Sequence, residues 1–233
     1  MGHISTVGGG SPVPFRPDQS WDGMPKEQLR VLFRARRRAL NPSEVIAADS
    51  ARTARLLDLL GQLAPSVVAC YASSTPWPWA GASGMDQIGG WVEPGTPELM
   101  SELLDAGVSV LLPSMLEGPR GENPLDGDPV WAQWSGEALV RGYSGIPSPA
   151  VSGEIVPLEM ADVIICPGLA GTPGGVRLGR GGGWMDRALL HARPGVPRWL
   201  LLNDWEVVHG LPSDPWDQLV TDLVTEERWI ACM

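Results

Sequence analysis

The feature that most constrains this chain is a short apolar run that leads into a glycine-rich loop. Val163–Cys166 is apolar and is followed by Pro167-Gly168, a pattern typical of a fully buried strand that ends in a turn. The loop beyond it combines glycines with arginines: Arg177, Gly179, Arg180, Gly181, Gly182 and Gly183. Helix-forming residues follow from Asp186. The chain is therefore expected to join a strand, a loop and a helix in that order.

This combination predicts a phosphate-binding loop. Glycines let backbone N–H groups approach an anion closely, a helix N-terminus adds positive potential, and arginines supply forked donors. Three consecutive glycines alone would suit a surface turn, but Arg177, Arg180 and Asp186 at the strand-to-helix junction favour phosphate binding. The spacing is not that of the G-x-x-x-x-G-K-[ST] loop, and it lacks the last glycine and the downstream acid of a dinucleotide fingerprint.

The same stretch resembles the signature of the 5-formyltetrahydrofolate cyclo-ligase family, also called methenyltetrahydrofolate synthetases. The resemblance rests on residues 177–187, RLGRGGGWMDR, preceded by PGLA at 167–170. Matching features extend from about Lys26 to Glu226. The resemblance implies a single three-layer α/β domain with a mostly parallel central sheet flanked by helices. It also implies an ATP- and Mg²⁺-dependent enzyme that converts 5-formyltetrahydrofolate to 5,10-methenyltetrahydrofolate.

Length and composition agree with one globular enzyme domain. The 233 residues suffice for one α/β domain, and 43% hydrophobic with 19% charged residues argues against disorder. The net charge of −10 argues against a nucleic-acid partner. The sequence has no long apolar run and no signal peptide at its start, so we expect no membrane contact and a cytoplasmic protein. A monomer and a dimer are both compatible with this composition.

The coarse organisation is a tail followed by alternating helices and strands. Residues 1–22 are rich in Gly, Ser and Pro and are predicted to be a mobile tail, with the domain spanning 23–233. Alternating elements argue for a parallel sheet, and the expected ranges are a helix from Pro25, a helix at 44–62, a strand at 66–71, a helix at 96–106, and strands at 108–113 and 198–203. Residues 75–90 resemble an insertion, in which Trp77 and Trp79 would sit where a substrate lid belongs.

The first helix carries an apolar stripe and a basic face. The stripe contains Leu29, Leu32, Phe33 and Leu40, and the basic face contains Lys26, Arg30, Arg34, Arg37 and Arg38. Composition alone would make this a solvated face. The resemblance instead implies that Lys26 and Arg30, together with Arg34, bind the nucleotide phosphates. Lys26 is also the only lysine in the chain.

The resemblance assigns further roles around the cleft. Arg177 and Lys26 are the expected catalytic residues, and Asp186 and Asp217 are the expected Mg²⁺ ligands. The ATP-binding set is Lys26, Arg30, Arg34, Arg177, Gly179, Arg180, Gly181, Gly182 and Gly183. Glu93 is the candidate for the pterin ring, because a carboxylate can bridge adjacent N–H donors. Helix capping is a competing role for both Asp186 and Glu93.

Several positions depart from the family pattern. Thr172 stands where the family has Asp, Ser148 where it has Glu, and Trp216 where it has His, while Trp184-Met185 replace paired tyrosines. We interpret these departures as converging on the acceptor, whose expected contacts are Glu93, Tyr143, Trp184 and Trp216. A less polar pocket leaves two alternatives open: an ATP-dependent ring-closing or amide-activating enzyme for a non-folate, aromatic substrate, or a non-catalytic folate- or nucleotide-binding relative. The retained loop and both acids favour an ATP-using enzyme.

Overall fold

The computed structural model describes residues 20–73, 93–116, 123–150 and 154–233. A seven-stranded sheet forms its centre, with the order β11-β10-β9-β6-β1-β2-β3. The inner strands, which all run parallel, are β10 (Asp222–Val224), β9 (Arg198–Leu201), β6 (Val163–Pro167), β1 (Val67–Ala69) and β2 (Ser109–Pro113). The two edge strands, β11 (Trp229–Ala231) and β3 (Trp131–Trp134), pair antiparallel. The expected mostly parallel sheet is confirmed.

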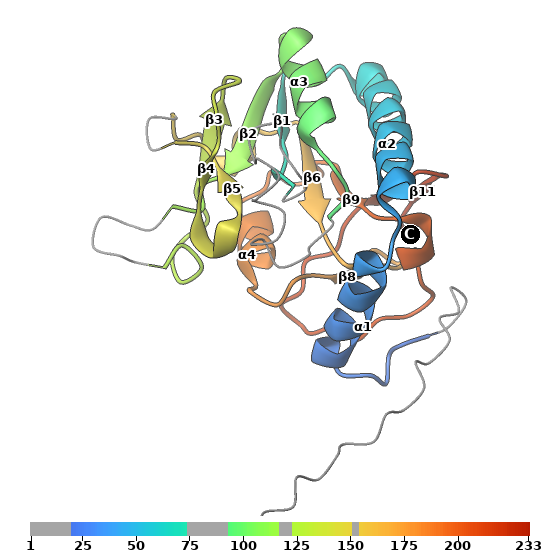
Figure 1. Cartoon of the computed structure of the whole chain (residues 1–233). Coiled ribbons are helices and arrows are strands. Elements are labelled where there is room, and N and C mark those ends of the chain that lie inside the picture. Colours follow the sequence, from blue (N-terminus) through green and yellow to red (C-terminus); the bar gives the residue numbers. More distant parts are fainter. Residues whose placement is uncertain (1–19, 74–92, 117–122, 151–153) are drawn as a thin grey trace, which may run out of the picture.

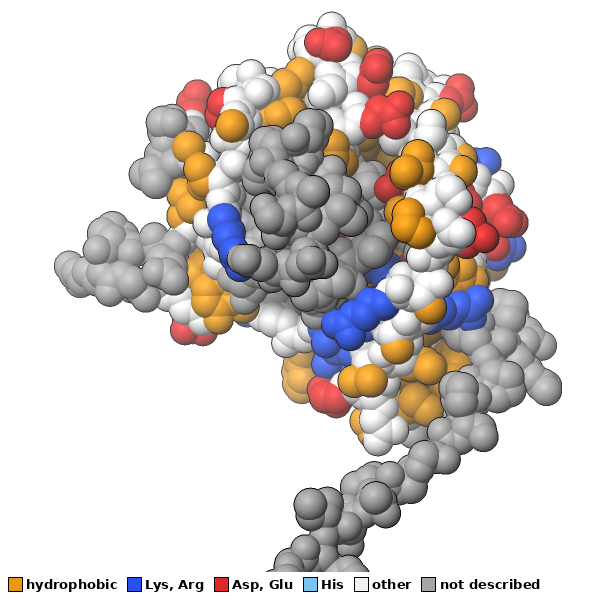
Figure 2. Space-filling model, viewed as in Figure 1, with side chains coloured by type: hydrophobic (Ala, Val, Ile, Leu, Met, Phe, Trp, Pro, Cys, Tyr) orange, Lys and Arg blue, Asp and Glu red, His pale blue; other side chains and the backbone are white. Residues whose placement is uncertain are grey.

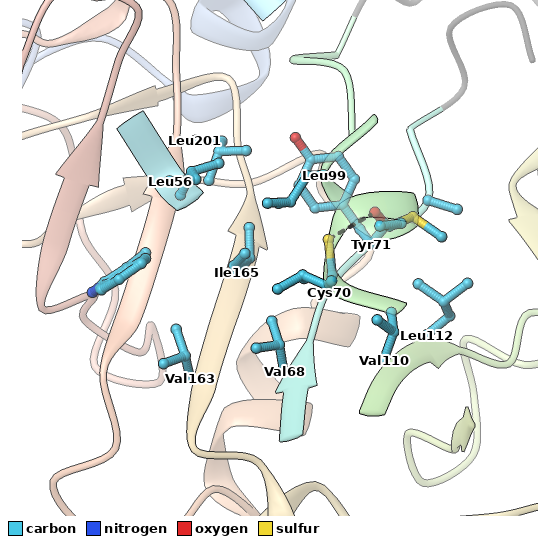
Figure 3. Packing of buried hydrophobic residues seen from close by; sticks show 14 of the residues in the cluster. Leu56, Val68, Cys70, Tyr71, Leu99, Val110, Leu112, Val163, Ile165 and Leu201 are labelled. Atoms are coloured by element: carbon cyan, nitrogen blue, oxygen red, sulfur yellow. Dashed lines mark hydrogen bonds between the residues drawn. The ribbon is translucent and has the colours of Figure 1, made fainter. Parts of the chain in front are cut away.

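Helices cover both faces of this sheet, which gives the expected three layers (Figure 1). α2 (Pro42–Leu63) and α3 (Pro97–Asp105) pack on one face, and the short α4 (Trp184–Leu190) packs on the other. Successive residues of a strand point to opposite faces, so Val68 and Cys70 meet α3 while Ala69 lies on the α4 side. Figure 3 shows the apolar packing between the sheet and the helices α2 and α3, where Leu99 packs against strand residues such as Ile165.

Short hairpins and 3₁₀ turns lie outside the central sheet. Two hairpins pair β4 (Val140–Arg141) with β5 (Pro147–Ser148) and β7 (Ala170–Gly171) with β8 (Arg177–Leu178). The 3₁₀ turns are η1 (Tyr143–Gly145), η2 (Leu158–Met160) and η3 (Asp204–Glu206). In the described part of the chain, no helix has the length and hydropathy needed to cross a membrane.

The first two helices begin within two residues of their predicted starts. α1 (Lys26–Arg38) begins directly after Pro25. α2 begins at Pro42, two residues before the expected position, because the Asn41 side chain accepts a hydrogen bond from Ser43 N at 3.0 Å and proline suits the first turn.

Arg37 is a correction to the predicted basic face of α1. Its side chain is only 3% exposed, and its guanidinium pairs with the fully buried Glu206 while Nη2 donates to the Gly168 carbonyl at 2.6 Å. The residue lies four positions after Phe33, so it shares the apolar stripe and points into the protein rather than into solvent. The buried pair attaches α1 to the 3₁₀ turn at Asp204–Glu206, and the hydrogen bond to Gly168 attaches it to the turn after β6.

The predicted tail also ends earlier than residue 22. Ser20 forms a bridge to Gly210, and Trp21 is 3% exposed in a cluster with Leu29 and Phe33. A large apolar ring gains free energy by leaving water. Trp21 therefore belongs to the folded unit, beside α1.

Candidate functional site

A cavity of about 580 Å³ opens where the parallel strands end. Pro167 is the last residue of β6 and Pro113 is the last residue of β2, while Tyr71 and Ala72 follow β1. All four residues line the cavity. Ligands of open α/β sheets bind in the crevice outside the carboxyl ends of the strands. The topology therefore places this cavity where a ligand is expected.

The glycine-rich loop forms one wall of the cavity. Gly181 has φ 107° and Gly183, the N-cap of α4, has φ 63°. These left-handed conformations favour glycine. A Cβ on Gly181 would also lie 3.3 Å from Cζ of Arg30. The glycines thus let the loop turn beside α1.

α1 supplies three cations to the cavity. Lys26, Arg30 and Arg34 recur every four residues and therefore lie on one helix face. Arg30 Nε donates to the Gly179 carbonyl at 3.0 Å, and Arg34 Nη2 donates to the Arg180 carbonyl at 2.8 Å. Burial lowers the pKa of Arg34, and the charges of Arg180, Arg30 and Arg38 lower it further. The structure thus brings the predicted basic helix and loop together, and basic side chains gather over α1 in Figure 2.

Lys26 lies between two carboxylates of the loop after η3. Its Nζ donates to Asp214 Oδ2 at 2.6 Å and to Asp217 Oδ2 at 2.5 Å. Burial alone would lower the pKa of Lys26, but hydrogen bonds and charges from both acids outweigh burial and raise it. Burial alone would raise the pKa of Asp217, but the hydrogen bonds from Lys26 and from the backbone of Asp214, together with the charge of Lys26, outweigh burial and lower it. Both groups are therefore held in their charged forms.

Arg177 and Asp186 form a second pair in the cavity. Nη2 of Arg177 lies 2.7 Å from Oδ1 of Asp186, and Arg177 is only 6% exposed. Asp186 Oδ1 also accepts from the backbone N–H of Gln218 at 3.2 Å. Since α4 begins at Trp184 and Gly183 is its N-cap, the helix-capping alternative for Asp186 is wrong. The carboxylate joins the loop wall to the Asp217 segment.

The donor set fits Mg²⁺ bound together with a polyphosphate. Hydrogen bonds from the described residues engage Oδ1 of Asp186 and Oδ2 of Asp217, which leaves the other oxygen of each carboxylate available. Across the described ranges, no group of three or more His, Cys, Asp or Glu side chains is placed to hold a metal by itself. Mg²⁺ commonly binds through one or two carboxylates plus substrate phosphates and keeps several waters. Asp186 and Asp217, both on the cavity wall, match that mode.

Glu93 also lines the cavity, beside Arg180. Its side chain is almost fully buried and accepts from Arg180 Nη1 at 3.0 Å. Burial raises the pKa of the neighbouring Tyr71 hydroxyl well above its usual value, and the Glu93 charge adds to this. Because α3 begins only at Pro97, the helix-capping alternative for Glu93 is wrong. The carboxylate is directed to Arg180 and the cavity instead.

The two tryptophans assigned to the acceptor differ in depth. Trp184 is 6% exposed and packs against Trp131, with ring centroids 5.4 Å apart, whereas Trp216 is 68% exposed. Both line the cavity, as does Tyr143 in η1. Trp184 therefore belongs to a buried core cluster that borders the cavity, whereas the side chain of Trp216 is open to solvent.

The other two departures from the family pattern lie outside the described cavity lining. Ser148 Oγ accepts from the backbone N–H of Met115 at 2.9 Å, and Thr172 Oγ1 accepts from that of Val176 at 3.2 Å. Both residues are buried. In this chain, Ser148 and Thr172 therefore satisfy backbone groups, and Ser148 does so at Met115, a residue of the cavity wall.

Sequence reasoning missed several wall residues: Tyr71, Met115, Leu125, Ile146 and Asp214. Only Asp214 carried a signal, because it precedes Asp217 by three residues in a proline-containing turn. The others are apolar or aromatic residues, which carry no signal of a binding site in the sequence. The predicted lid with Trp77 and Trp79 lies outside the described residues.

Fold and site together define a single-domain α/β enzyme whose cleft, at the carboxyl edge of the sheet, is lined by paired basic and acidic side chains. The chain belongs to the 5-formyltetrahydrofolate cyclo-ligase family, since a model of that family matches residues 23–226.

Individual relatives agree with this assignment. The chain is 33% identical over 147 residues to a 5-formyltetrahydrofolate cyclo-ligase of Mycolicibacterium smegmatis, covering 60% of this chain and 72% of the relative. A solved 5,10-methenyltetrahydrofolate synthetase from Aquifex aeolicus is 27% identical with a TM-score of 0.69, covering 89% of this chain and 92% of its own. A synthetase from Mycoplasma pneumoniae, 16% identical with a TM-score of 0.63 and coverages of 87% and 99%, supports the fold.

Proposed function

We propose that this protein is a 5-formyltetrahydrofolate cyclo-ligase that uses ATP and Mg²⁺, an activity of one-carbon metabolism. The observation that carries the proposal is one cleft with two chemically different ends. At one end Lys26 pairs with Asp214 and Asp217. The pair of Arg177 and Asp186 lines the same cavity and is joined to this loop by the hydrogen bond from Gln218 N to Asp186. At the other end the buried Glu93 is placed for a ligand with adjacent N–H donors.

The proposed reaction activates an oxygen and then closes a ring. The formyl oxygen attacks the γ-phosphorus of ATP, and ADP leaves. The neighbouring amine nitrogen of the folate then attacks the activated formyl carbon and releases its proton to solvent. The C–O bond then breaks, and phosphate departs with that oxygen to give the methenyl bridge. Catalysis of such a transfer consists mainly of placement and charge neutralisation. Lys26, Arg30 and Arg177 are the residues we assign to neutralise the phosphates.

Asp186 and Asp217 are the residues we assign to Mg²⁺. The ion would supply positive charge to the phosphates, as it does in phosphoryl-transfer sites generally. In the structure both carboxylates already pair with cations of the cleft. Binding of the metal–nucleotide complex would exchange these partners, so that cations turn to phosphates and carboxylates to the metal. The exchange keeps each buried charge compensated, which limits its cost.

The position of Glu93 favours a folate over a non-folate acceptor. Glu93 remains available with its charge balanced by Arg180. A pterin edge loses about 1–3 kcal/mol for each buried group left unpaired, and Glu93 supplies the acceptor that prevents this loss.

A direct assay tests the proposal. Protein mixed with ATP, Mg²⁺ and 5-formyltetrahydrofolate should develop the near-ultraviolet absorbance of the methenyl product, and omission of ATP should abolish it. Binding of ATP measured by calorimetry without any product would refute the cyclo-ligase activity and return the non-folate enzyme or the non-catalytic relative. The same assay on the E102Q variant, in which an exposed carboxylate on α3 is neutralised, serves as the matched control for substitutions of Glu93.

A further inference from the structure

We propose that Trp216 is the stacking platform for the adenine base of ATP, an inference that rests on the nucleotide site proposed above. The sequence assigned Trp216 to the acceptor together with Trp184. The structure separates the two tryptophans, and the arrangement of α1 along the cleft decides which end each residue serves.

α1 orders the cleft from end to end. Lys26 and Arg34 lie eight residues apart on one helix face, so their Cα atoms are separated by about 12 Å at 1.5 Å per residue. Arg34 contacts the Arg180 carbonyl, and Arg180 pairs with Glu93. Lys26 contacts Asp214 and Asp217, which flank Trp216 in sequence. The cleft thus has a Glu93 end and a Trp216 end.

The direction of the nucleotide follows from the chemistry. The γ-phosphoryl group must reach the acceptor, which the proposed function places against Glu93. The α- and β-phosphates then run along Arg30 towards Lys26, and the base lies beyond Lys26. Trp216 is the aromatic residue that lines the described cavity at that end.

Trp216 is held on a fixed loop while its ring stays open. Asp214 N donates to Asp217 Oδ2 at 2.8 Å, Asp217 N donates to the Asp214 carbonyl at 3.0 Å, and Gln218 Nε2 donates to the Trp216 carbonyl at 3.2 Å. Yet 68% of Trp216 is exposed, and among the described residues its ring has neither an aromatic neighbour nor a hydrogen bond. A planar base covering this ring would bury apolar surface and add base–aromatic stacking, which tolerates any base because each has a π-face.

The test compares two ligands that differ in the nucleoside. Titration calorimetry with Mg²⁺ present should show that W216A binds ATP at least about fivefold more weakly, the lower range for a lost base–aromatic stack. Binding of inorganic tripolyphosphate should be unchanged, because Lys26, Arg30 and Arg177 remain. W216F, which keeps a ring, should retain most of the ATP affinity. W229A serves as the control, since Trp229 is a half-exposed tryptophan on the edge strand β11.

Two results would overturn the inference. Equal weakening of ATP and tripolyphosphate by W216A would mean that the residue only positions the Lys26 loop. An unchanged ATP affinity with a raised KM for 5-formyltetrahydrofolate would return Trp216 to the acceptor. A wild-type protein that binds neither ATP nor tripolyphosphate would instead refute the nucleotide site as a whole, so failure of the two proposals is distinguishable.

Discussion

The Nζ atom of Lys26 lies 2.5 Å from Oδ2 of Asp217, a residue 191 positions away in sequence. This contact joins the first helix of the domain to a loop near its C-terminal end. The side chains of Lys26 and Asp217 are only 15% and 12% exposed. The pair therefore links the stability of the fold to the proposed phosphate and metal groups.

Asp217→Asn should lower stability in a pH-dependent manner. The pKa of Asp217 is depressed in the folded state, so its contribution is present above its unfolded pKa of about 3.9 and is lost as pH falls through the folded value. At pH 7 we expect a loss on the order of 1 kcal/mol, typical of a partly exposed pair. The free energies of unfolding in urea should therefore differ at pH 7, and the difference should begin to shrink at about pH 3.9 and disappear below the folded pKa. A constant difference down to acidic pH would contradict this.

Arg177→Ala should weaken nucleotide binding and also destabilise the protein. Arg177 is buried and paired with Asp186, so its removal leaves that carboxylate without its charged donor, at a cost of about 1–3 kcal/mol. Calorimetry with Mg²⁺ and ATP should show the loss of affinity, and urea unfolding the loss of stability. R198A is a matched control, because Arg198 lies at the opposite, amino end of β9. Unaltered ATP affinity in R177A would exclude Arg177 from the phosphate site.

Asp186→Asn should remove Mg²⁺-dependent turnover while preserving the fold. Asparagine Oδ1 still accepts from the Gln218 N–H, which now contacts Asp186 at 3.2 Å, but a neutral amide is a poorer Mg²⁺ ligand than a carboxylate. The Mg²⁺ dependence of product formation is the measurement. D105N, at the exposed end of α3, should behave as wild type. Full turnover at unchanged Mg²⁺ concentration in D186N would show that the metal role is wrong.

Glu93→Gln should abolish or strongly slow cyclo-ligase turnover and spare ATP binding. Glutamine presents one acceptor oxygen instead of two and no longer balances the Arg180 charge. Steady-state assays should show the defect in 5-formyltetrahydrofolate use, with calorimetric ATP affinity retained. Equal loss of both ligands would argue against the division of the cleft into two ends.

Arg37→Met should destabilise the protein by about 3–5 kcal/mol, because it leaves the buried Glu206 charge uncompensated. The double variant R37M/E206Q should recover part of this loss, since the charge is then removed from both sides. Urea unfolding of the single and double variants measures both effects. A single variant as stable as wild type would mean that the pair is not closed in solution.

The sequence determined the features whose physical cause is local. Periodicity placed α1, α3 and the buried strands, and the glycines between Arg177 and Trp184 marked the loop, because backbone conformation and amphipathicity depend on residues near in sequence. The motif around Gly181 was sufficient to indicate the family. The tertiary structure alone decided which charges meet.

Arg37 and Arg34 look alike in sequence, yet Arg37 pairs with Glu206 in the core and Arg34 lines the cleft. Trp184 and Trp216 looked equivalent, yet one packs on Trp131 and the other is open. Asp214 can be recognised as a site residue only from the folded structure, which places its loop against Lys26. Such contacts join residues far apart in the chain, so they depend on how the sheet orders its strands, which no local pattern specifies.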